Sequence, residues 1–262
     1  MRAGDEAVGA GASEGAAGDD AREIGEAGIG EAGIGEAEIG EAEIGRIVAE
    51  GGVDRWGAAV NDPPLPLAPS LPTAISLVMR FRPSSLEGVA ESGPNETYYR
   101  EYCRLNETLD AVGGRLVALF RERGWRAELV PATLYDDEAV EDWGRAGVFP
   151  HKTAATQAGL GWIGKTALFV SLRLGPKVRL ATVFTDLRVP PGIPLTSSRC
   201  GKCRLCVDAC PVGAGRDVLW QAGMPRDELY DEKACEIYTE RFPELGGVCG
   251  ICVAACPLGK RE

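Results

Sequence analysis

Eight of the nine cysteines in this 262-residue chain lie between Cys200 and Cys256, seven of them in two related runs and one, Cys235, between the runs. The first run, residues 200–211, has the spacing C-x2-C-x2-C-x3-C-P. The second run, residues 249–257, repeats its last three cysteines and its proline at a constant offset of 46 residues. Cys235, fourteen residues before the second run, can replace the cysteine that this run lacks. The spacing is typical of bacterial proteins that bind [4Fe–4S] clusters.

In such proteins the fourth cysteine of a run ligates the other cluster, so the sequence predicts four ligands for each of two clusters. Cluster 1 takes Cys200, Cys203, Cys206 and Cys256, and cluster 2 takes Cys210, Cys235, Cys249 and Cys252. Zinc is the alternative, since C-x2-C pairs also suit tetrahedral thiolate sites. The exchange of a cysteine between two repeats favours iron–sulfur clusters, which serve one-electron transfer. We expect the ninth cysteine, Cys103, to be structural.

The cysteines also bear on the cellular compartment. A secreted disulfide scaffold needs an export signal, and no basic-then-apolar stretch opens this sequence. No apolar run approaches the roughly 20 residues that a membrane helix needs. We therefore expect a cytoplasmic protein with reduced thiols and no membrane association.

The acidic balance of the chain is concentrated at its N-terminus. The net charge is −11, of which residues 1–50 carry −10. A five-residue unit opened by glycine repeats over residues 24–45, and one apolar residue in five matches neither a helix nor a strand. The sequence thus predicts a disordered acidic low-complexity tail over residues 1–50. The nearly neutral remainder argues against a strongly basic surface for nucleic acid.

Residues 51–192 are predicted to form an α/β (α+β) cofactor-type domain. Residues 74–81 and 125–130 have the apolar, β-prone composition of strands, and residues 97–122 carry apolar side chains at helical spacing. Such alternation of helices and strands predicts an α/β layer. Residues 193–262 are then a small ferredoxin-like domain for two clusters.

A glycine-rich loop at residues 159–166, here called the glycine elbow, matches both G-x-x-x-x-G-K-[ST] and G-x-G-x-x-G. A phosphate-binding loop must follow a strand and open a helix. Here residues 152–158 are helical in character, and residues 167–172 look like a strand that forms a hairpin with residues 178–185. The order argues against a nucleoside triphosphate site. Either the elbow packs tightly against other backbone, with Trp162 in the core, or it approaches a bulky cofactor or substrate.

The elbow, the strand that ends at Asp186 and the cysteine runs occur in an order that resembles epoxyqueuosine reductase and its iron–sulfur relatives over residues 70–257. The resemblance implies an α/β cofactor domain followed by the two-cluster domain. In that family the clusters feed electrons to a cobalamin, which removes the epoxide oxygen from a modified tRNA base. Reductive dehalogenases are more distant relatives. The resemblance places the elbow near a corrinoid and makes cofactor-binding candidates of Gly159, Gly161, Trp162, Gly164 and Lys165.

Departures from the family leave the substrate unknown and weigh against tRNA. Arg145 stands thirteen residues before Ala158, where the family's enzymes have an acidic proton donor. The sequence ends six residues after Cys256, without the family's helical repeat module, and the body shows no evident tRNA-binding surface. We therefore predict no efficient reduction of epoxyqueuosine in tRNA, and cobalamin stays an open alternative beside a flavin.

We expect an oxidoreductase that passes single electrons through two clusters to a cofactor or substrate in the α/β domain. The donor would be a ferredoxin, a flavodoxin or a reductase. The alternatives are a non-enzymatic electron carrier and a cobalamin-dependent tRNA epoxyqueuosine reductase. His151, the one histidine of the sequence, is the candidate proton donor because histidine titrates near pH ~6.5. Glu141 and Asp142 are weaker candidates, and Lys165 is a candidate contact for a phosphate or carboxylate.

Overall fold

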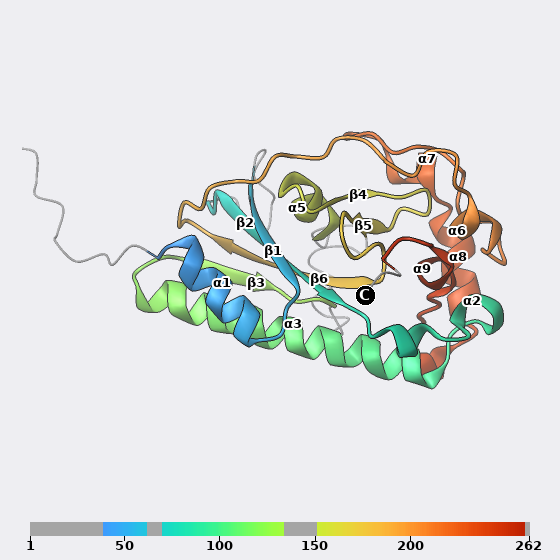
Figure 1. The fold of residues 1–262 in the computed structure, drawn as a ribbon, viewed down its shortest axis with the longest axis horizontal. Helices are drawn as coiled ribbons and strands as arrows, with labels where there is room; N and C mark the ends of the chain where they lie inside the picture. The colour runs from blue at the N-terminus through green and yellow to red at the C-terminus, as the bar shows by residue number, and fades with distance from the viewer. Residues whose placement is uncertain (1–38, 62–69, 134–150, 260–262) are drawn as a thin grey trace, which may run out of the picture. The chain divides into compact units, whose positions relative to one another are not determined.

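The computed structural model describes residues 39–61, 70–133 and 151–259 (Figure 1). Residues 36–262 group as one compact unit. The predicted boundary between residues 192 and 193 stays a prediction, and the described residues on both sides of it belong to that unit. None of the helices in the described ranges is long and apolar enough to cross a membrane.

A four-stranded antiparallel sheet forms the centre of this unit (Figure 1). Its strand order is β1-β2-β6-β3, with β1 at Arg55–Val60, β2 at Thr73–Arg80, β6 at Val178–Thr185 and β3 at Ala127–Val130. The two predicted strands at residues 74–81 and 125–130 therefore exist. All pairings in this sheet are antiparallel, which makes the mixed helix and sheet architecture α+β.

Both faces of the sheet are covered, which is why the central strands are apolar throughout. On β2, Ile75 and Leu77 belong to the main core together with helix α3 (Glu96–Glu122). Val78 packs instead with Ala155 of helix α5. Successive residues of a strand point to opposite faces, so α3 and α5 (His151–Gln157) lie on opposite sides of the sheet. A strand buried on both faces reads as a continuous apolar run.

The predicted helix over residues 97–122 is confirmed as α3, Glu96–Glu122. Its N-cap is Asn95, whose side-chain oxygen accepts a hydrogen bond from the Tyr98 backbone N–H at 2.8 Å. Gly124 follows the last turn with a φ of 88°, as a helix stop requires. The buried face of α3 carries the large apolar residues of the main core, among them Leu105, Leu109, Leu116 and Phe120.

The predicted disordered tail is wrong in its last part. Helix α1 spans Glu41–Glu50, and Ile44, Ile47 and Val48 on it are buried in the main core. These three residues follow the i, i+3, i+4 spacing of a helix face. Ile44 is the last apolar residue of the five-residue repeat, and Ile47 and Val48 come after the repeat has ended at residue 45. The preceding residues 1–38 lie outside the described ranges.

The predicted hairpin is also wrong. The glycine elbow itself contributes strand β4, Gly161–Ile163, which pairs with β5, Phe169–Ser171. The next strand, β6, pairs instead with β2 and β3 in the main sheet. Its six consecutive buried residues require neighbours on all sides, which a two-stranded hairpin cannot provide. The predicted helix at residues 152–158 is confirmed as α5.

The cysteine-rich segment is built from short helices joined by loops (Figure 1). They are α6 at Leu205–Asp208, α7 at Arg226–Leu229, α8 at Glu232–Thr239, the 3-10 turn η2 at Pro243–Leu245, and α9 at Ile251–Ala255. Cys206 and Cys252 occupy the second position of α6 and α9 respectively, and these two helices pack together. The offset of 46 residues in the sequence is therefore also a repeat in the fold. Between β2 and α3, the turn η1 (Pro83–Leu86) and helix α2 (Val89–Ser92) bring the chain against α9.

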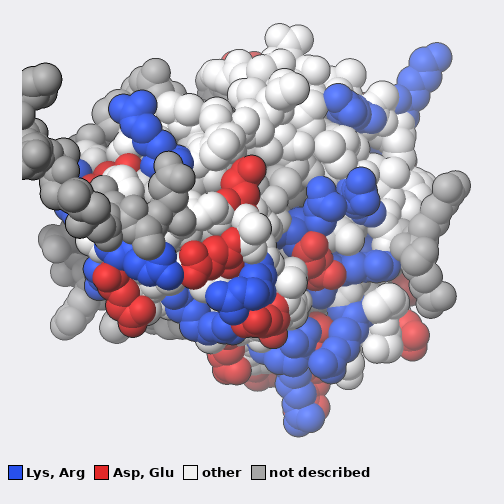
Figure 2. Space-filling model, turned by 60° about the vertical axis from the view of Figure 1, so that its left-hand side comes forward, with Lys and Arg blue, Asp and Glu red and all other residues white. Residues whose placement is uncertain are grey.

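The surface agrees with a nearly neutral body. On the face shown in Figure 2, lysine and arginine side chains alternate with acidic ones, and the remaining area is largely uncharged. The described part of this face thus has no extended area of a single charge sign.

Candidate functional site

The thiols predicted for cluster 1 lie together. Burial raises the pKa of Cys206, and repulsion from the neighbouring sulfurs of Cys256, Cys200 and Cys203 adds to the effect. Cys256 in turn interacts with Cys200 and Cys203, and its pKa is raised in the same way, with burial as the main cause. Cys256, fifty residues away in the sequence, thus joins the first run.

The thiols predicted for cluster 2 form a second group. Burial raises the pKa of Cys252 to about 12, and the next contribution is repulsion from its neighbour Cys249. Cys249 and Cys252 both interact with Cys235 and Cys210. Cys252 also interacts with Cys206, so the two groups are adjacent. The cysteines in each group are those expected if the fourth cysteine of each run ligates the other cluster. That these cysteines ligate iron stays a prediction.

The spacing of the thiols bears on the kind of metal group. Among the described residues, no three His, Cys, Asp or Glu side chains lie close enough to hold one metal ion. The four thiolates of a [4Fe–4S] cluster do not need to converge on one point, because each binds a different iron. The described spacing therefore leaves both alternatives, zinc and iron–sulfur clusters, in place.

Each thiol group has its own hydrogen-bond donors. In the first group, the Trp162 indole N–H donates to Cys200 Sγ at 3.4 Å, and the Thr166 hydroxyl donates to Cys206. In the second group, the Ala214 backbone N–H donates to Cys210 Sγ at 3.3 Å, and the Tyr230 hydroxyl donates to Cys235. These sulfurs stand for the thiolates that would hold the clusters, and hydrogen bonds to such sulfurs help to set a cluster's reduction potential.

The glycines of the elbow are explained by close approach of backbone. A Cβ on Gly159, where φ is 73°, would lie 2.5 Å from the Ile193 carbonyl oxygen. A Cβ on Gly161 would lie 2.1 Å from the Val170 oxygen, so neither position accepts a side chain. Tight packing, one of the two alternatives for the elbow, therefore accounts for these glycines. A Cβ on Gly164 would lie 3.7 Å from Cys200 Sγ, which puts the elbow next to the first thiol group.

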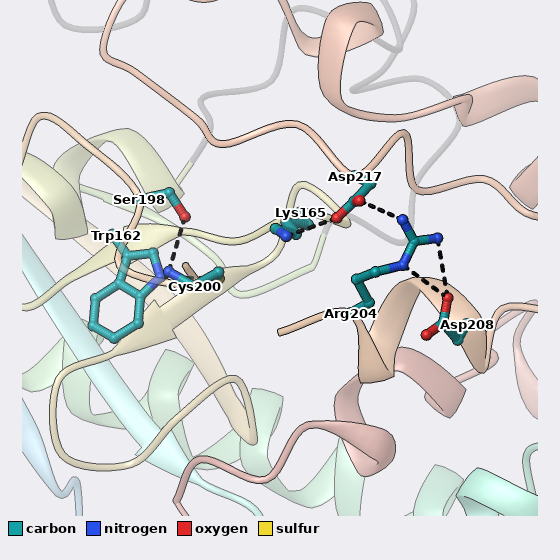
Figure 3. Close-up of polar contacts among 7 residues, drawn as sticks. All are labelled: Trp162, Lys165, Ser198, Cys200, Arg204, Asp208 and Asp217. Atoms are coloured by element: carbon teal, nitrogen blue, oxygen red, sulfur yellow. Dashed lines mark hydrogen bonds and ion pairs between the residues drawn. The ribbon is translucent and has the colours of Figure 1, made fainter. Parts of the chain in front are cut away.

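Lys165 is used inside the protein. Its side chain is only 5% exposed, and Nζ lies 2.7 Å from Asp217 Oδ1 (Figure 3). Asp217 also pairs with Arg204, which in turn pairs with Asp208 of α6. Its hydrogen bond with Lys165, and then the charge of Arg204, hold the pKa of the Asp217 carboxyl below its usual value. Lys165 thus ties the elbow to the first cysteine run, and we find it bound to a carboxylate of the protein itself.

A cavity of about 740 Å³ lies between the sheet layer and the cysteine-rich segment. Three cysteines of the second group, Cys235, Cys249 and Cys252, line it, and none of the first group does. Aromatic side chains form much of the remaining wall, namely Phe81, Tyr98, Tyr102, Phe169, Trp220 and Tyr230. Volumes of roughly 300–1,000 Å³ are usual for sites that bind small molecules or cofactors.

The charged groups in this wall are all cations. Lys152, Arg179 and Arg226 line the cavity, and no acidic residue is among its described lining residues. Burial lowers the pKa of Lys152 to about 8, with repulsion from Arg226 as the next cause. Arg226 is paired with Glu232 at 2.7 Å, outside the lining. The cavity therefore suits an anionic group.

Arg179 is held in place by several contacts. Its guanidinium carbon lies 4.2 Å from the centroid of the Tyr102 ring. Its nitrogens donate to the Asn106 side-chain oxygen and to the Thr133 hydroxyl, at 2.8 and 2.7 Å. These contacts fix its orientation before any ligand binds, which reduces the entropic cost of binding.

His151 lines the cavity as a neutral side chain. Its Nε2 donates to the Pro131 carbonyl oxygen at 3.0 Å, which assigns the tautomer because a carbonyl can only accept. Nδ1 then accepts from the Thr182 hydroxyl at 2.8 Å. Burial lowers the pKa of His151 to about 4, so at neutral pH it carries no second ring proton to release. This geometry favours a positioning role over that of the predicted proton donor.

The other predicted residues are placed as follows. None of Gly159, Gly161, Trp162, Gly164 and Lys165 lines the cavity, although Ile163 of the same loop does. The five predicted residues are therefore not brought to the cavity, and the loop meets it through Ile163 alone. Glu141, Asp142 and Arg145 lie outside the described ranges. Sequence reasoning missed Lys152 on α5, Arg179 on β6, and Arg226 and Tyr230 at the two ends of α7, which share no motif.

Comparisons with known proteins support the kind of metal group. The family described as "4Fe-4S double cluster binding domain" matches residues 199–259, which contain all eight clustered cysteines. The match supports two [4Fe–4S] clusters as the metal groups of this segment.

Curated proteins match parts of the chain. The chain is 29% identical over 159 residues to an epoxyqueuosine reductase of Pseudomonas aeruginosa, covering 58% of this chain and 40% of that protein. It is 41% identical over 63 residues to a tetrachloroethene reductive dehalogenase of Desulfitobacterium hafniense, covering 23% and 11% of the two chains. The chain thus spans less than half the length of these relatives.

Solved structures show the same fold. A reductive dehalogenase described in terms of B12-dependent dehalogenation superposes with a TM-score of 0.66 at 18% identity, covering 88% of this chain and 34% of the other. An epoxyqueuosine reductase from Streptococcus thermophilus superposes with a TM-score of 0.52 at 17% identity, covering 85% and 66%. Together the comparisons confirm the resemblance to epoxyqueuosine reductase-like iron–sulfur proteins.

Proposed function

We propose that this chain, which resembles the epoxyqueuosine reductases and the reductive dehalogenases, is an oxidoreductase that delivers single electrons through two [4Fe–4S] clusters to an acceptor in the cavity. The observation that carries the proposal is the unequal placement of the two thiol groups. Three thiols of cluster 2 line the cavity, whereas the exposed thiol among the eight, Cys203, belongs to cluster 1.

This placement gives the relay a direction. A small electron-transfer protein reaches the exposed Cys203 side first, so an external one-electron carrier would reduce cluster 1. Cys206 and Cys252 interact across the packed helices α6 and α9, so the residues that would hold the two clusters are adjacent. Cys235, Cys249 and Cys252 would hold cluster 2 at the wall of the cavity, where it would supply electrons one at a time.

The cavity is suited to a planar organic group that carries an anionic substituent. Its aromatic wall offers faces for a flat ring system, and Lys152, Arg179 and Arg226 offer charge to a phosphate or carboxylate. A corrinoid, the kind of group on which the related B12-dependent dehalogenase relies, meets this description. When bound, it supplies a strongly reducing metal centre for cleavage of carbon–oxygen or carbon–halogen bonds.

The residues of this chain would bind and orient such a group. His151 Nδ1 and Nε2 are hydrogen-bonded to Thr182 and Pro131, so His151 is not placed to act as an axial ligand. The three cations would hold the anionic substituent. The Cys249–Cys252 segment of the wall would bring the cluster against the ring.

The proposal is tested by cofactor binding to cluster-loaded protein. We expect anaerobically prepared protein to retain or rebind one hydroxocobalamin or one flavin per chain, measured by absorption and cobalt analysis. Met224→Trp, which fills the cavity wall, should abolish this binding. Ile193→Trp, at an 87% exposed position, is the matched control and should leave it unchanged. If neither cofactor binds, and both variants exchange electrons with a partner reductase at the wild-type rate, the chain is an electron carrier.

Reduction of epoxyqueuosine in tRNA is the second candidate, favoured by the name of the Pseudomonas relative and by a solved epoxyqueuosine reductase with an epoxyqueuosine-modified tRNA stem loop. Our sequence-based prediction opposes it, because a guanidinium at Arg145 is a poor proton donor. Complementation of a queuosine-deficient strain, scored by mass spectrometry of nucleosides, decides between them. Full restoration of queuosine by this chain would refute the prediction.

A further inference from the structure

The glycine elbow borders the cavity only through Ile163, whereas two of its polar side chains reach the sulfurs of cluster 1. It has the composition of a nucleotide loop without the helix that such a loop must open, since β4 and β5 flank its turn. Its contacts with Cys200 and Cys206 therefore need an explanation of their own.

Trp162 provides the first contact. The side chain belongs to β4, is 6% exposed, and packs in a small core with Trp220 and Leu229. Its indole N–H, which can only donate, points to Cys200 Sγ at 3.4 Å (Figure 3). A buried indole of this kind has one rigid orientation, so the hydrogen bond is maintained by packing.

Thr166 provides the second contact. It is 5% exposed, and its hydroxyl donates to the thiol of Cys206. The turn around it is closed by two backbone hydrogen bonds, from Gly164 to Leu168 at 2.8 Å and from Ala167 to Gly164 at 3.0 Å. The hydroxyl is therefore held at the sulfur by backbone geometry.

Lys165 lies between these two residues and holds the elbow against the cysteine run. It reaches Asp217, and Asp217 reaches Arg204, which directly precedes α6 with Cys206 (Figure 3). The same loop thus provides two donors to two cysteines of one predicted cluster, and an ion-pair connection between them.

We propose that the glycine elbow is the redox-tuning element of cluster 1. A hydrogen bond to a cluster thiolate stabilises the reduced state, which carries one more negative charge, and so raises the reduction potential. Trp162 and Thr166 act as positioning and tuning residues on cluster 1. Tyr230, through Cys235, does the same for cluster 2. The inference requires bound clusters but no acceptor in the cavity.

The test is a redox titration of the anaerobic, cluster-loaded protein, followed by electron paramagnetic resonance. Trp162→Phe keeps a ring and removes the N–H, and Thr166→Val keeps the volume and removes the hydroxyl. Each variant should lower the midpoint potential of the same one of the two clusters by about 59 mV. For a one-electron couple this is about a tenfold change in the equilibrium constant for reduction. The other midpoint should not move, and the double variant should shift further.

Two variants serve as matched controls. Thr166→Ser retains a hydroxyl and should keep the wild-type midpoint. If Trp162→Phe loses iron, the comparison of Thr166→Val with Thr166→Ser still tests the proposal. Tyr230→Phe should shift the midpoint that the elbow variants leave in place. Unchanged midpoints in iron-replete Trp162→Phe and Thr166→Val would overturn the proposal. The proposal would also be overturned if Trp162→Phe and Tyr230→Phe shifted the midpoint potential of the same cluster. Neither result depends on an acceptor, so the proposed function is tested separately.

Discussion

The sheet layer and the cysteine-rich segment are stabilised in different ways. Strand β2 buries seven of its eight residues between α3 and α5, and the largest fully buried side chains are in the sheet layer. In the cysteine-rich segment, helix α8 and the turn η2 have no buried residue. Apolar burial therefore accounts for the first region. The second has too little core for its length and depends on its metal groups, as small metal-binding domains do.

Removal of the clusters should have the largest effect on this contrast. Anaerobic chelation of iron should leave β2 and β6 protected from hydrogen exchange and should expose the amides of α8 and α9. The reason is that α8 and η2 bury no residue, so bonds from the cysteines to the clusters would be the main constraint on this part of the chain. Hydrogen–deuterium exchange of the cluster-loaded and iron-free proteins, followed by mass spectrometry, measures this difference in protection. Equal protection of α8 in both states would show that the segment folds without metal.

Deletion of α1 should have the next largest effect, on the sheet layer alone. Removal of residues 1–50 exposes the site of Ile44, Ile47 and Val48, and at about 1.5–3 kcal/mol per buried side chain this costs on the order of 5 kcal/mol. Removal of residues 1–38 should cost little, because the repeat there has no helical or strand period. Thermal unfolding compares the two deletions at equal iron content. Equal stability of both would mean that α1 does not contribute to the core.

The smallest effect concerns the cavity between the two regions. Lys152 has a pKa lowered to about 8, so its ammonium group loses its proton as pH rises from 7 to 9. Arg179 and Arg226 also face the cavity, and Glu232 pairs with Arg226. The affinity of the cavity for sulfate, which keeps its two negative charges over this interval, should therefore fall about five- to tenfold.

Calorimetric titration with sulfate measures this pH dependence. In Lys152→Met the affinity should be low at both pH values, and the dependence should disappear. His151 titrates near pH 4 and does not contribute in this window. Affinity that is constant from pH 7 to 9 in the wild type would place the anion elsewhere.

Much of this fold could be predicted from short-range patterns in the sequence. The period of apolar residues located α3 to within one residue, and the spacing of cysteines predicted which thiols lie together. Both patterns are local, or are tied to a fixed chemical requirement.

Other features depend on contacts that no local pattern records. Helix α1 is short and follows a repeat, so its three apolar residues gain meaning only against α3. The β5 and β6 strands look like a hairpin, but β6 pairs in the main sheet because it is buried on both faces. The cavity brings Lys152, Arg179 and Arg226 together from separate elements, and the burial that lowers the pKa of His151 is invisible in its neighbours along the chain.

The central claim is that the two groups of cysteines hold two [4Fe–4S] clusters with one exchanged ligand each. The most direct measurement is iron, sulfide and electron paramagnetic resonance analysis of anaerobic protein, for the wild type and for Cys256→Ser and Cys210→Ser. The account predicts about eight iron and eight sulfide per chain, with two reduced clusters whose spins interact. Cys256→Ser should alter the same signal as Cys206→Ser, and Cys210→Ser the same signal as Cys252→Ser. Two zinc ions without sulfide, or a Cys256→Ser change in the signal of Cys252→Ser, would contradict it.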